Sequence, residues 1–511
     1  MRTRYLISLA LLAAARASSP SVPPAAPPAA PTVIQPAPRS LSGIWLGTLD
    51  VGKKLRIQLR LDLVASPPRC SLDSLDQHAL GIPCGNVVAS GTSLSLDVPA
   101  VGGSLIGTVS ADGNSVSATW TQEGSGIPLV LARQTAAIEP PKPVFDPVMP
   151  PVVLEKLEAV LSADLAAVLE RGELAAAKRG GVTIGVVVHG ARRILSYGDA
   201  KPDSVFEIGS LTKTFTGLAL AQMAAQKKVR LDEPVRALLP ASAALAPASG
   251  AEITLVDLSA QRSGLPRLPD NLSPTDPSNP YAEYDQKALY AFMARHGVAR
   301  PPKPEFGYSN LGVGLLGDAL ASRAGSTYEA LLQSQVTGPL GMRATAITLS
   351  PAMRARFVAG HDSDHLPARA WDLGALAAAG ALKSTAQDML TYLEAQLHPE
   401  HLPAAARATA ERKTLAAAIR ASHELQADVG DGMHIALNWF RVDATGSFWH
   451  NGGTGGHSAF ALFNPEKDLA VVVLSNTTTG PDSITDALAQ HIVQRLTGAP
   501  AVSLAPAPSS P

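Results

Sequence analysis

The chain has 511 residues, of which 46% are hydrophobic and 17% charged, and its formal net charge is -1. The length suggests two or three domains, and the composition is that of a globular protein with a sizeable core rather than of a disordered chain. Nucleic-acid-binding proteins usually carry a basic excess, so no nucleic acid is expected as a partner.

The first 17 residues have the features of an export signal. Arg2 and Arg4 supply positive charge, Tyr5 to Ala15 form an apolar run, and Ala15-Arg16-Ala17 offers a cleavage site. The run is shorter than the ~20 residues that span a bilayer, which argues against a membrane anchor. We therefore expect a signal peptide over residues 1–17, no transmembrane segment after its cleavage, and a periplasmic or secreted protein.

A small β domain is predicted next. Residues 18–38 are rich in Pro and Ala and predict an extended linker. Runs that alternate between hydrophobic and polar residues follow, such as Leu55 to Leu61 and Ser93 to Leu96, and they predict antiparallel strands. We expect a small antiparallel β domain over residues 39–135, with a role in binding or spacing because it contains no cluster of catalytic residue types.

The chain has two cysteines, Cys70 and Cys84. In an oxidising compartment they would form one disulfide, worth ~3 kcal/mol for a short loop, and the alternative is two independent buried thiols. The sequence leaves both interpretations open. The pair has neither the number nor the spacing of a zinc site.

A proline-rich linker over residues 136–151 precedes a mixed domain over 152–498, and 499–511 is expected to be a flexible tail. Most segments between about 211 and 397 have helical patterns, and Ser384-Thr385-Ala386-Gln387 fits a capping box. Apolar runs near both ends of the domain predict strands: Val182 to His189, Ile435 to Val442, Ser458 to Phe463 and Leu469 to Leu474. One sheet built from both ends, with an inserted helical lobe, satisfies this order.

The strongest chemical signal is the S-x-x-K pattern of Ser210 and Lys213. A helical pattern starts just after Gly209, which places Ser210 at a helix N-terminus that favours developing negative charge. Lys213 faces the same side one turn later. A serine hydroxyl needs an adjacent base, and a desolvated lysine can serve as one. Alone, the pattern also fits an N-cap serine followed by an exposed lysine.

A second signal is the run Gly307-Tyr308-Ser309-Asn310, in a loop that leads into a helix. Tyr308 can relay a proton and Asn310 can donate to a substrate carbonyl, although a turn with a packed aromatic ring fits as well. The third signal is the glycine-rich run from Trp449 to Gly456, where a backbone N–H can complete an oxyanion hole with that of Ser210.

The pattern G-x-G-x-x-G from Gly312 to Gly317 is a false signal. It lies inside a helical pattern and follows no strand, whereas the dinucleotide fingerprint needs strand, turn and helix in that order.

The order of the three signals resembles the serine β-lactamases and DD-peptidases, with Y-x-N about a hundred residues after S-x-x-K and the glycine-rich run near the C-terminus. The Y-x-N form is similar to the class C branch and its esterase and peptidase relatives. The flanking runs also look like that family: Val229 to Pro240, Ser263 to Pro266, Leu382 to Leu393 and Leu474 to Asn476. The resemblance covers about residues 154–496 and not the β-rich segment ahead of it.

The resemblance implies an α+β fold of the β-lactamase/transpeptidase-like type. In this fold an antiparallel sheet flanked by helices lies beside an all-helical lobe. It implies that Ser210 is acylated while Lys213 and Tyr308 share the proton transfers, with either as the base. Asn310, His450, Gly452, Gly453 and Thr454 would bind substrate, and the backbone N–H groups of Ser210 and Gly453 would form the oxyanion hole. No metal or organic cofactor is implied.

His450 departs from the β-lactamase pattern, in which lysine usually begins the third motif. Since a solvated histidine has a pKa near ~6.5, we expect weaker and pH-dependent carboxylate recognition, with activity changing between about pH 6 and 7.5.

The expected activity is hydrolysis of β-lactams or cell-wall-type amides by an exported serine hydrolase. The alternatives are an esterase or D-amino-acid peptidase of the same fold, or a non-hydrolytic penicillin-binding sensor. The partner is a small-molecule or peptide substrate, with peptidoglycan as a further candidate to which the β domain would dock.

Overall fold

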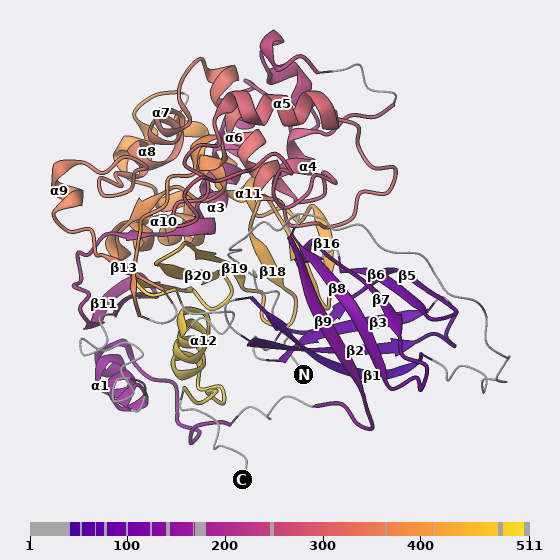
Figure 1. The fold of residues 1–511 in the computed structure, drawn as a ribbon. Coiled ribbons are helices and arrows are strands. Elements are labelled where there is room, and N and C mark those ends of the chain that lie inside the picture. Colours follow the sequence, from indigo (N-terminus) through magenta and orange to yellow (C-terminus); the bar gives the residue numbers. More distant parts are fainter. Residues whose placement is uncertain are drawn as a thin grey trace, which may run out of the picture. The chain divides into compact units, whose positions relative to one another are not determined.

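The structure is a computed structural model that describes residues 41–504, apart from 52–53, 67, 76–78, 99–100, 123–124, 139–143, 167, 169–179, 246–249, 363–364, 411 and 479–483. The predicted signal peptide (1–17) and Pro/Ala-rich linker (18–38) lie outside the described residues. The chain divides into two compact units, residues 1–140 and 141–511 (Figure 1).

Unit 1 is built from one antiparallel sheet in the order β4-β3-β2-β1-β9-β8-β7-β6-β5 (Figure 1, indigo to purple). Its strands are β1 Gly43–Asp50, β2 Lys54–Asp62, β3 Arg69–Ser74, β4 Ala79–Pro83, β5 Gly85–Ser90, β6 Ser93–Val98, β7 Gly103–Val109, β8 Ser115–Gln122 and β9 Ser125–Gln134. Alternate side chains, such as Trp45, Leu59 and Leu94, form a core of their own. Only Cys84 separates the two edge strands β4 and β5.

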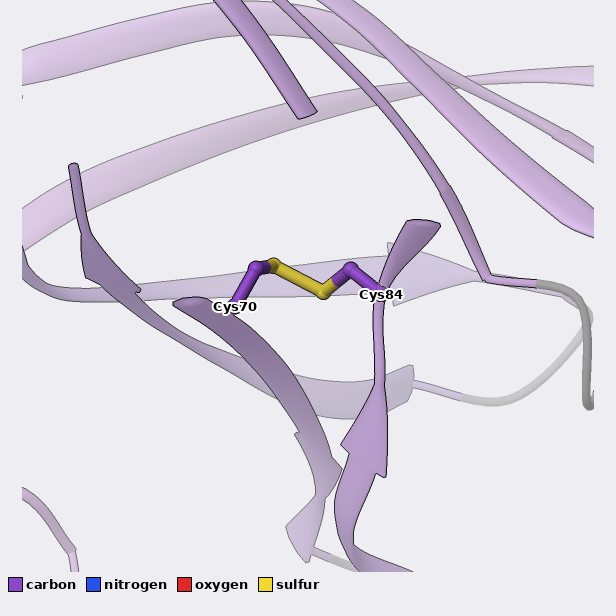
Figure 2. Close-up of a disulfide and its surroundings, with 2 residues drawn as sticks. All are labelled: Cys70 and Cys84. Carbon is purple, nitrogen blue, oxygen red and sulfur yellow. A yellow bond between two sulfur atoms is a disulfide. The ribbon is translucent and has the colours of Figure 1, made fainter. Parts of the chain in front are cut away.

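A disulfide joins Cys84 to Cys70 on β3 (Figure 2). The Cys84 backbone N–H also donates to the Cys70 carbonyl at 3.1 Å. Both bonds link the β4–β5 junction to β3, so they tie the two edges of the sheet together.

Unit 2 contains an eight-stranded antiparallel sheet in the order β11-β10-β21-β20-β19-β18-β17-β16. Its strands are β10 Gly181–Val188, β11 Ala191–Gly198, β16 Ala427–Gly430, β17 Met433–Ile435, β18 Phe440–Val442, β19 Phe448–Gly453, β20 Ser458–Asn464 and β21 Leu469–Ser475. β10 therefore pairs with β21, nearly 300 residues later. The expected single sheet from both ends of the domain is what the structure has.

Both faces of this sheet are covered, which explains why β10, β20 and β21 are apolar runs without alternation. On one face, α10 (Ala386–Leu397) packs against β10 and β21. On the other, α12 (Ile484–Thr497) packs against β20 and β21, and α1 (Leu157–Asp164) contributes Leu157 and Leu161 to the same apolar cluster.

The helical lobe between β11 and β16 surrounds α3 (Thr212–Ala225), which is buried on nearly all sides (Figure 1, magenta to orange). Its other helices are α4 Leu255–Ser259, α5 Gln286–His296, α6 Asn310–Ala324, α7 Tyr328–Leu332, α8 Gly338–Leu340, α9 Pro351–Arg354 and α11 Leu415–Ser422. The false dinucleotide pattern lies inside α6. No helix in the described part of the chain is long and apolar enough to cross a membrane.

Three local expectations were wrong. The run from Ile435 to Val442 is not one strand but the ends of β17 and β18, because Asn438 adopts a left-handed conformation (φ 64°) that turns the chain. The N-cap of α10 is Thr385, which accepts from Asp388 N, rather than Ser384, which lies in β15 (Lys383–Ser384). The start of the expected tail is packed, since Ala501 is buried and its carbonyl accepts from Asp146 N.

Candidate active site

Ser210 lies in a short 3-10 turn, η5 (Gly209–Leu211), directly before α3. Gly209 has φ +49°, and a Cβ there would lie 2.6 Å from Gly453 N. A side chain is therefore excluded at this position, and the tight turn brings the Ser210 backbone beside the end of β19. Ser210 is partly exposed, whereas the residues on both sides of it are buried.

Lys213 is fully buried on the first turn of α3, with Nζ 2.9 Å from Ser210 Oγ and 2.7 Å from the Ala379 carbonyl. Burial lowers the pKa of Lys213 well below its usual value, and the nearby charge of Arg267 lowers it further. Both effects favour the neutral amine, which has a lone pair that can accept a proton from Ser210.

Tyr308 is a further neighbour of Ser210, whose side chain acts on the Tyr308 pKa. Lys213 Nζ lies 4.9 Å and Arg267 Cζ 5.1 Å from the centre of its ring. Burial raises the pKa of Tyr308, and the Arg267 charge and the Ser210 hydrogen bond offset this only in part. The phenol therefore keeps its proton at neutral pH and can act as a donor.

A pocket opens beside Ser210, with Asn310 at the start of α6 in its wall. Asn310 Oδ1 is buried and, among the described residues, has no hydrogen-bond partner. An orphaned buried acceptor of this kind is costly unless a ligand or water pairs with it. The rest of the lining is mostly apolar: Tyr281, Trp371, Leu373, Leu376, Ala379, Gly380, Gly453 and Thr454.

The end of β19 runs directly against the Ser210 turn. A Cβ on Gly452 would lie 2.1 Å from the Ile208 carbonyl and 2.8 Å from Ser210 N, so only glycine fits there. Thr454 N donates to the His457 carbonyl. Hydrogen-bonded and non-hydrogen-bonded pairs alternate along an antiparallel ladder, so the neighbouring pair, Gly453 and Ser458, exchanges no backbone hydrogen bonds. The N–H of Gly453 consequently points away from β20, on the side where the Ser210 turn lies.

His450 does not behave as expected. Its side chain is buried in β19, with Nδ1 2.6 Å from the Asn451 carbonyl. Burial, together with the charge of Lys213, lowers the pKa of His450 to about 3. The lowered pKa favours a neutral imidazole at physiological pH, which argues against the hypothesis that His450 changes charge between pH 6 and 7.5.

The structure adds a buried acid that the sequence analysis missed. Glu207, in β12 (Phe206–Glu207), accepts from the Thr454 hydroxyl at 2.7 Å, from His457 Nδ1 at 3.2 Å and from Trp371 N at 2.9 Å. Burial alone would raise the pKa of Glu207, but these hydrogen bonds and the charges of His457 and Lys383 lower it. Glu207 lies between apolar residues, three positions before Ser210, and this is the sequence signal that could have identified the buried acid.

His457 joins this buried acid to a further segment. Its Nε2 lies 3.2 Å from the Val358 carbonyl, while Nδ1 faces Glu207. The Thr454 hydroxyl is committed to this network by its hydrogen bond to Glu207.

Two groups of side chains in the described residues have the spacing of metal ligands, and neither includes a residue of the Ser210 site. One consists of Asp146, Asp164 and His491, and the Arg495 guanidinium already pairs with both of its carboxylates. The other is the partly exposed set His398, Glu400 and His401, which lies after α10.

Residues 166–495 match the family model described as Beta-lactamase. The chain belongs to the beta-lactamase family. As a member it is a serine hydrolase that combines helices with antiparallel sheets. The match begins after α1, ends within α12 and contains all three predicted motifs.

Curated relatives agree with this family. The chain is 28% identical over 329 residues to the D-alanyl-D-alanine-carboxypeptidase/endopeptidase AmpH of Escherichia coli (strain K12), covering 61% of this chain and 84% of the relative. It is 29% identical over 340 residues to a beta-lactamase of Pseudomonas fluorescens (58% and 88%), and 28% over 359 residues to one of Yersinia enterocolitica (62% and 87%).

Proposed function

We propose that this beta-lactamase family member is an exported hydrolase that cleaves β-lactams or cell-wall-type amides through an acyl-enzyme on Ser210. The observation that carries the proposal is the buried Lys213 amine, 2.9 Å from the Ser210 hydroxyl and with a lowered pKa. The export part depends on the signal-like residues 1–17 and implies a periplasmic or secreted location.

In the first step Lys213 accepts the hydroxyl proton while Ser210 Oγ attacks the substrate carbonyl carbon. The carbonyl oxygen gains negative charge and is stabilised by the backbone N–H groups of Ser210 and Gly453. When the C–N bond breaks, the leaving nitrogen takes a proton from Tyr308. Water then hydrolyses the acyl-enzyme: it gives one proton to the Tyr308 phenolate while its oxygen attacks the acyl carbon, and Lys213 returns its proton to Ser210 Oγ as the ester bond breaks. The opposite pKa shifts of Lys213 and Tyr308 support Lys213 as base and Tyr308 as donor.

Substrate contacts are assigned on the same basis. Asn310 would pair its orphaned oxygen with an amide N–H of the substrate side chain. The apolar wall of Tyr281, Trp371 and Leu376 would receive the acyl group. Amides are supported as substrates by the names of the relatives, which include a D-alanyl-D-alanine carboxypeptidase and beta-lactamases.

The test is mass spectrometry of the protein mixed with a chromogenic cephalosporin, or with a peptide ending in D-alanyl-D-alanine, while product release is followed. We expect an adduct and turnover that are both absent in Ser210→Ala. A persistent adduct without turnover would favour the penicillin-binding sensor, and reaction with esters alone would favour the esterase. Failure of every substrate class to label Ser210 would refute the proposal.

A further inference from the structure

The site lacks a cation at the position where the resembling β-lactamases carry lysine, because His450 is buried and neutral. The substrates of the proposed function nevertheless carry a carboxylate. In a β-lactam and in a peptide cleaved at its last residue, that carboxylate is attached to the carbon next to the leaving nitrogen. A cation near the leaving-group side of Ser210 is therefore required from another element.

Arg267 is the cation whose charge acts on both proton-transfer groups, since it lowers the pKa of Lys213 and of Tyr308. It lies in the loop after α4, and its carbonyl accepts from the N–H groups of Asn310 (3.0 Å) and Leu311 (3.2 Å). The start of α6, which carries Asn310 into the pocket wall, thus also fixes the backbone of Arg267.

The Arg267 guanidinium lies over the Tyr308 ring, with Cζ 5.1 Å from the ring centre. A guanidinium that lies over an aromatic ring can keep N–H donors available for a further partner. Since the proposed function assigns Tyr308 to the leaving nitrogen, the same assignment puts Arg267 near the leaving group.

Arg267 also differs from the arginines around it. Arg262 and Arg300 both pair with Asp257, and Arg295 pairs with Asp270. Across the described residues, no carboxylate lies within ion-pair distance of Arg267, although its side chain is partly buried. A half-buried guanidinium without a counter-ion, over the ring of Tyr308, can bind an anion.

We propose that Arg267 binds the carboxylate next to the scissile bond and so makes this enzyme selective for amides whose leaving group is an α-amino acid or an equivalent ring carboxylate. This inference rests on the proposed function of Ser210. It assigns to the loop after α4 the recognition that the neutral His450 does not provide.

The experiment compares two acyl substrates that differ only in the leaving-group carboxylate, free in one and converted to its primary amide in the other. We expect Arg267→Gln to lower the ratio of the two kcat/KM values by about 10- to 100-fold, the range for a hydrogen bond to a charged group. Arg267→Lys should lower it by less, because the charge remains while the planar fork is lost. Arg295→Gln, which removes an exposed charge of the same lobe, should keep the wild-type ratio.

The ratio isolates carboxylate binding, because the effect of Arg267 on the Lys213 pKa acts on both substrates alike. In the wild-type protein the ratio should also fall as salt is raised. A ratio unaffected by Arg267→Gln and by salt, with Ser210 still labelled, would overturn the Arg267 inference and leave the proposed function intact. Absence of Ser210 labelling by both substrates would instead overturn the proposed function, and this inference with it.

Discussion

The Thr454 hydroxyl donates a 2.7 Å hydrogen bond to Glu207 Oε2, although 247 residues separate the two along the chain. Glu207 precedes the Ser210 turn, Thr454 follows the end of β19, and the other oxygen of Glu207 accepts from Trp371 N in the pocket wall. One buried carboxylate thus connects three segments that surround the nucleophile.

Glu207→Gln should lower both stability and kcat. Glutamine has a single acceptor oxygen, so it cannot serve Trp371 on one side and Thr454 with His457 on the other, and the buried Glu207–His457 pair is lost. Breaking such a buried pair costs about 3 kcal/mol. Denaturant unfolding of unit 2 measures it, with Glu394→Gln, a more exposed glutamate paired with Arg192, as the matched control. Equal stability of Glu207→Gln and wild type would contradict the role of this network.

Lys213→Met should lower the rate of Ser210 acylation by about 10³-fold, a typical contribution of general-base catalysis. The apolar side chain fills the buried space but cannot accept the hydroxyl proton. Single-turnover kinetics with a chromogenic substrate measures the acylation step directly. Lys227→Met, at an exposed position after the same helix, is the control and should acylate like wild type. A small effect of Lys213→Met would transfer the role of base to Tyr308.

The pH dependence of kcat/KM should have an acid limb that belongs to Lys213. The neutral amine is the active form, so the rate rises with pH through the Lys213 pKa, which burial places well below that of a free lysine. Removing the Arg267 charge should raise this pKa and move the limb to higher pH.

His450 should add no limb between pH 6 and 7.5, because its pKa is about 3. The pH profile of His450→Asn should keep the shape of the wild-type profile between these values, even where its absolute rates differ. If a step in the wild-type profile near pH 6.5 disappears in His450→Asn, the imidazole is titrating there and the neutral assignment is wrong.

Loss of the disulfide should destabilise unit 1 and spare the chemistry of unit 2. The bond spans 14 residues, and closing a loop of that size is worth about 3 kcal/mol. The double variant Cys70→Ser/Cys84→Ser should therefore show an earlier melting transition for unit 1 in calorimetry. Reduced wild type should melt like the variant, while Ser210 labelling stays at the wild-type level. An unchanged transition in both would mean that the bond adds no stability.

The three motifs could be identified from the sequence because their order and separation along the chain are specific, although each is weak alone. The central sheet could also be predicted, since Gly181–Val188 and Leu469–Ser475 are apolar over their whole length and require cover on both faces. Glu207 could not be assigned a role in this way, because its partners Trp371, Thr454 and His457 come from distant segments.

The charge of His450 was misjudged for a related reason. The ordinary pKa of histidine is that of a solvated side chain, whereas burial in β19 and the nearness of Lys213 are properties of the folded chain. The turn at Asn438 was missed because it is stabilised by long-range contacts, among them the Asn438 hydrogen bonds to Ser259 and Gln261.

The sequence by itself determined the family, through the order of its three motifs. It also determined the candidate nucleophile, because residues three apart on a helix lie on one face whatever the rest of the chain does. It also determined which runs are buried strands, through their hydrophobicity. Only the tertiary structure decided which groups are charged and which are paired around Ser210. Protonation and pairing depend on burial and on neighbours distant in the chain, and folding alone brings Lys213, Tyr308, Glu207 and Arg267 to one place.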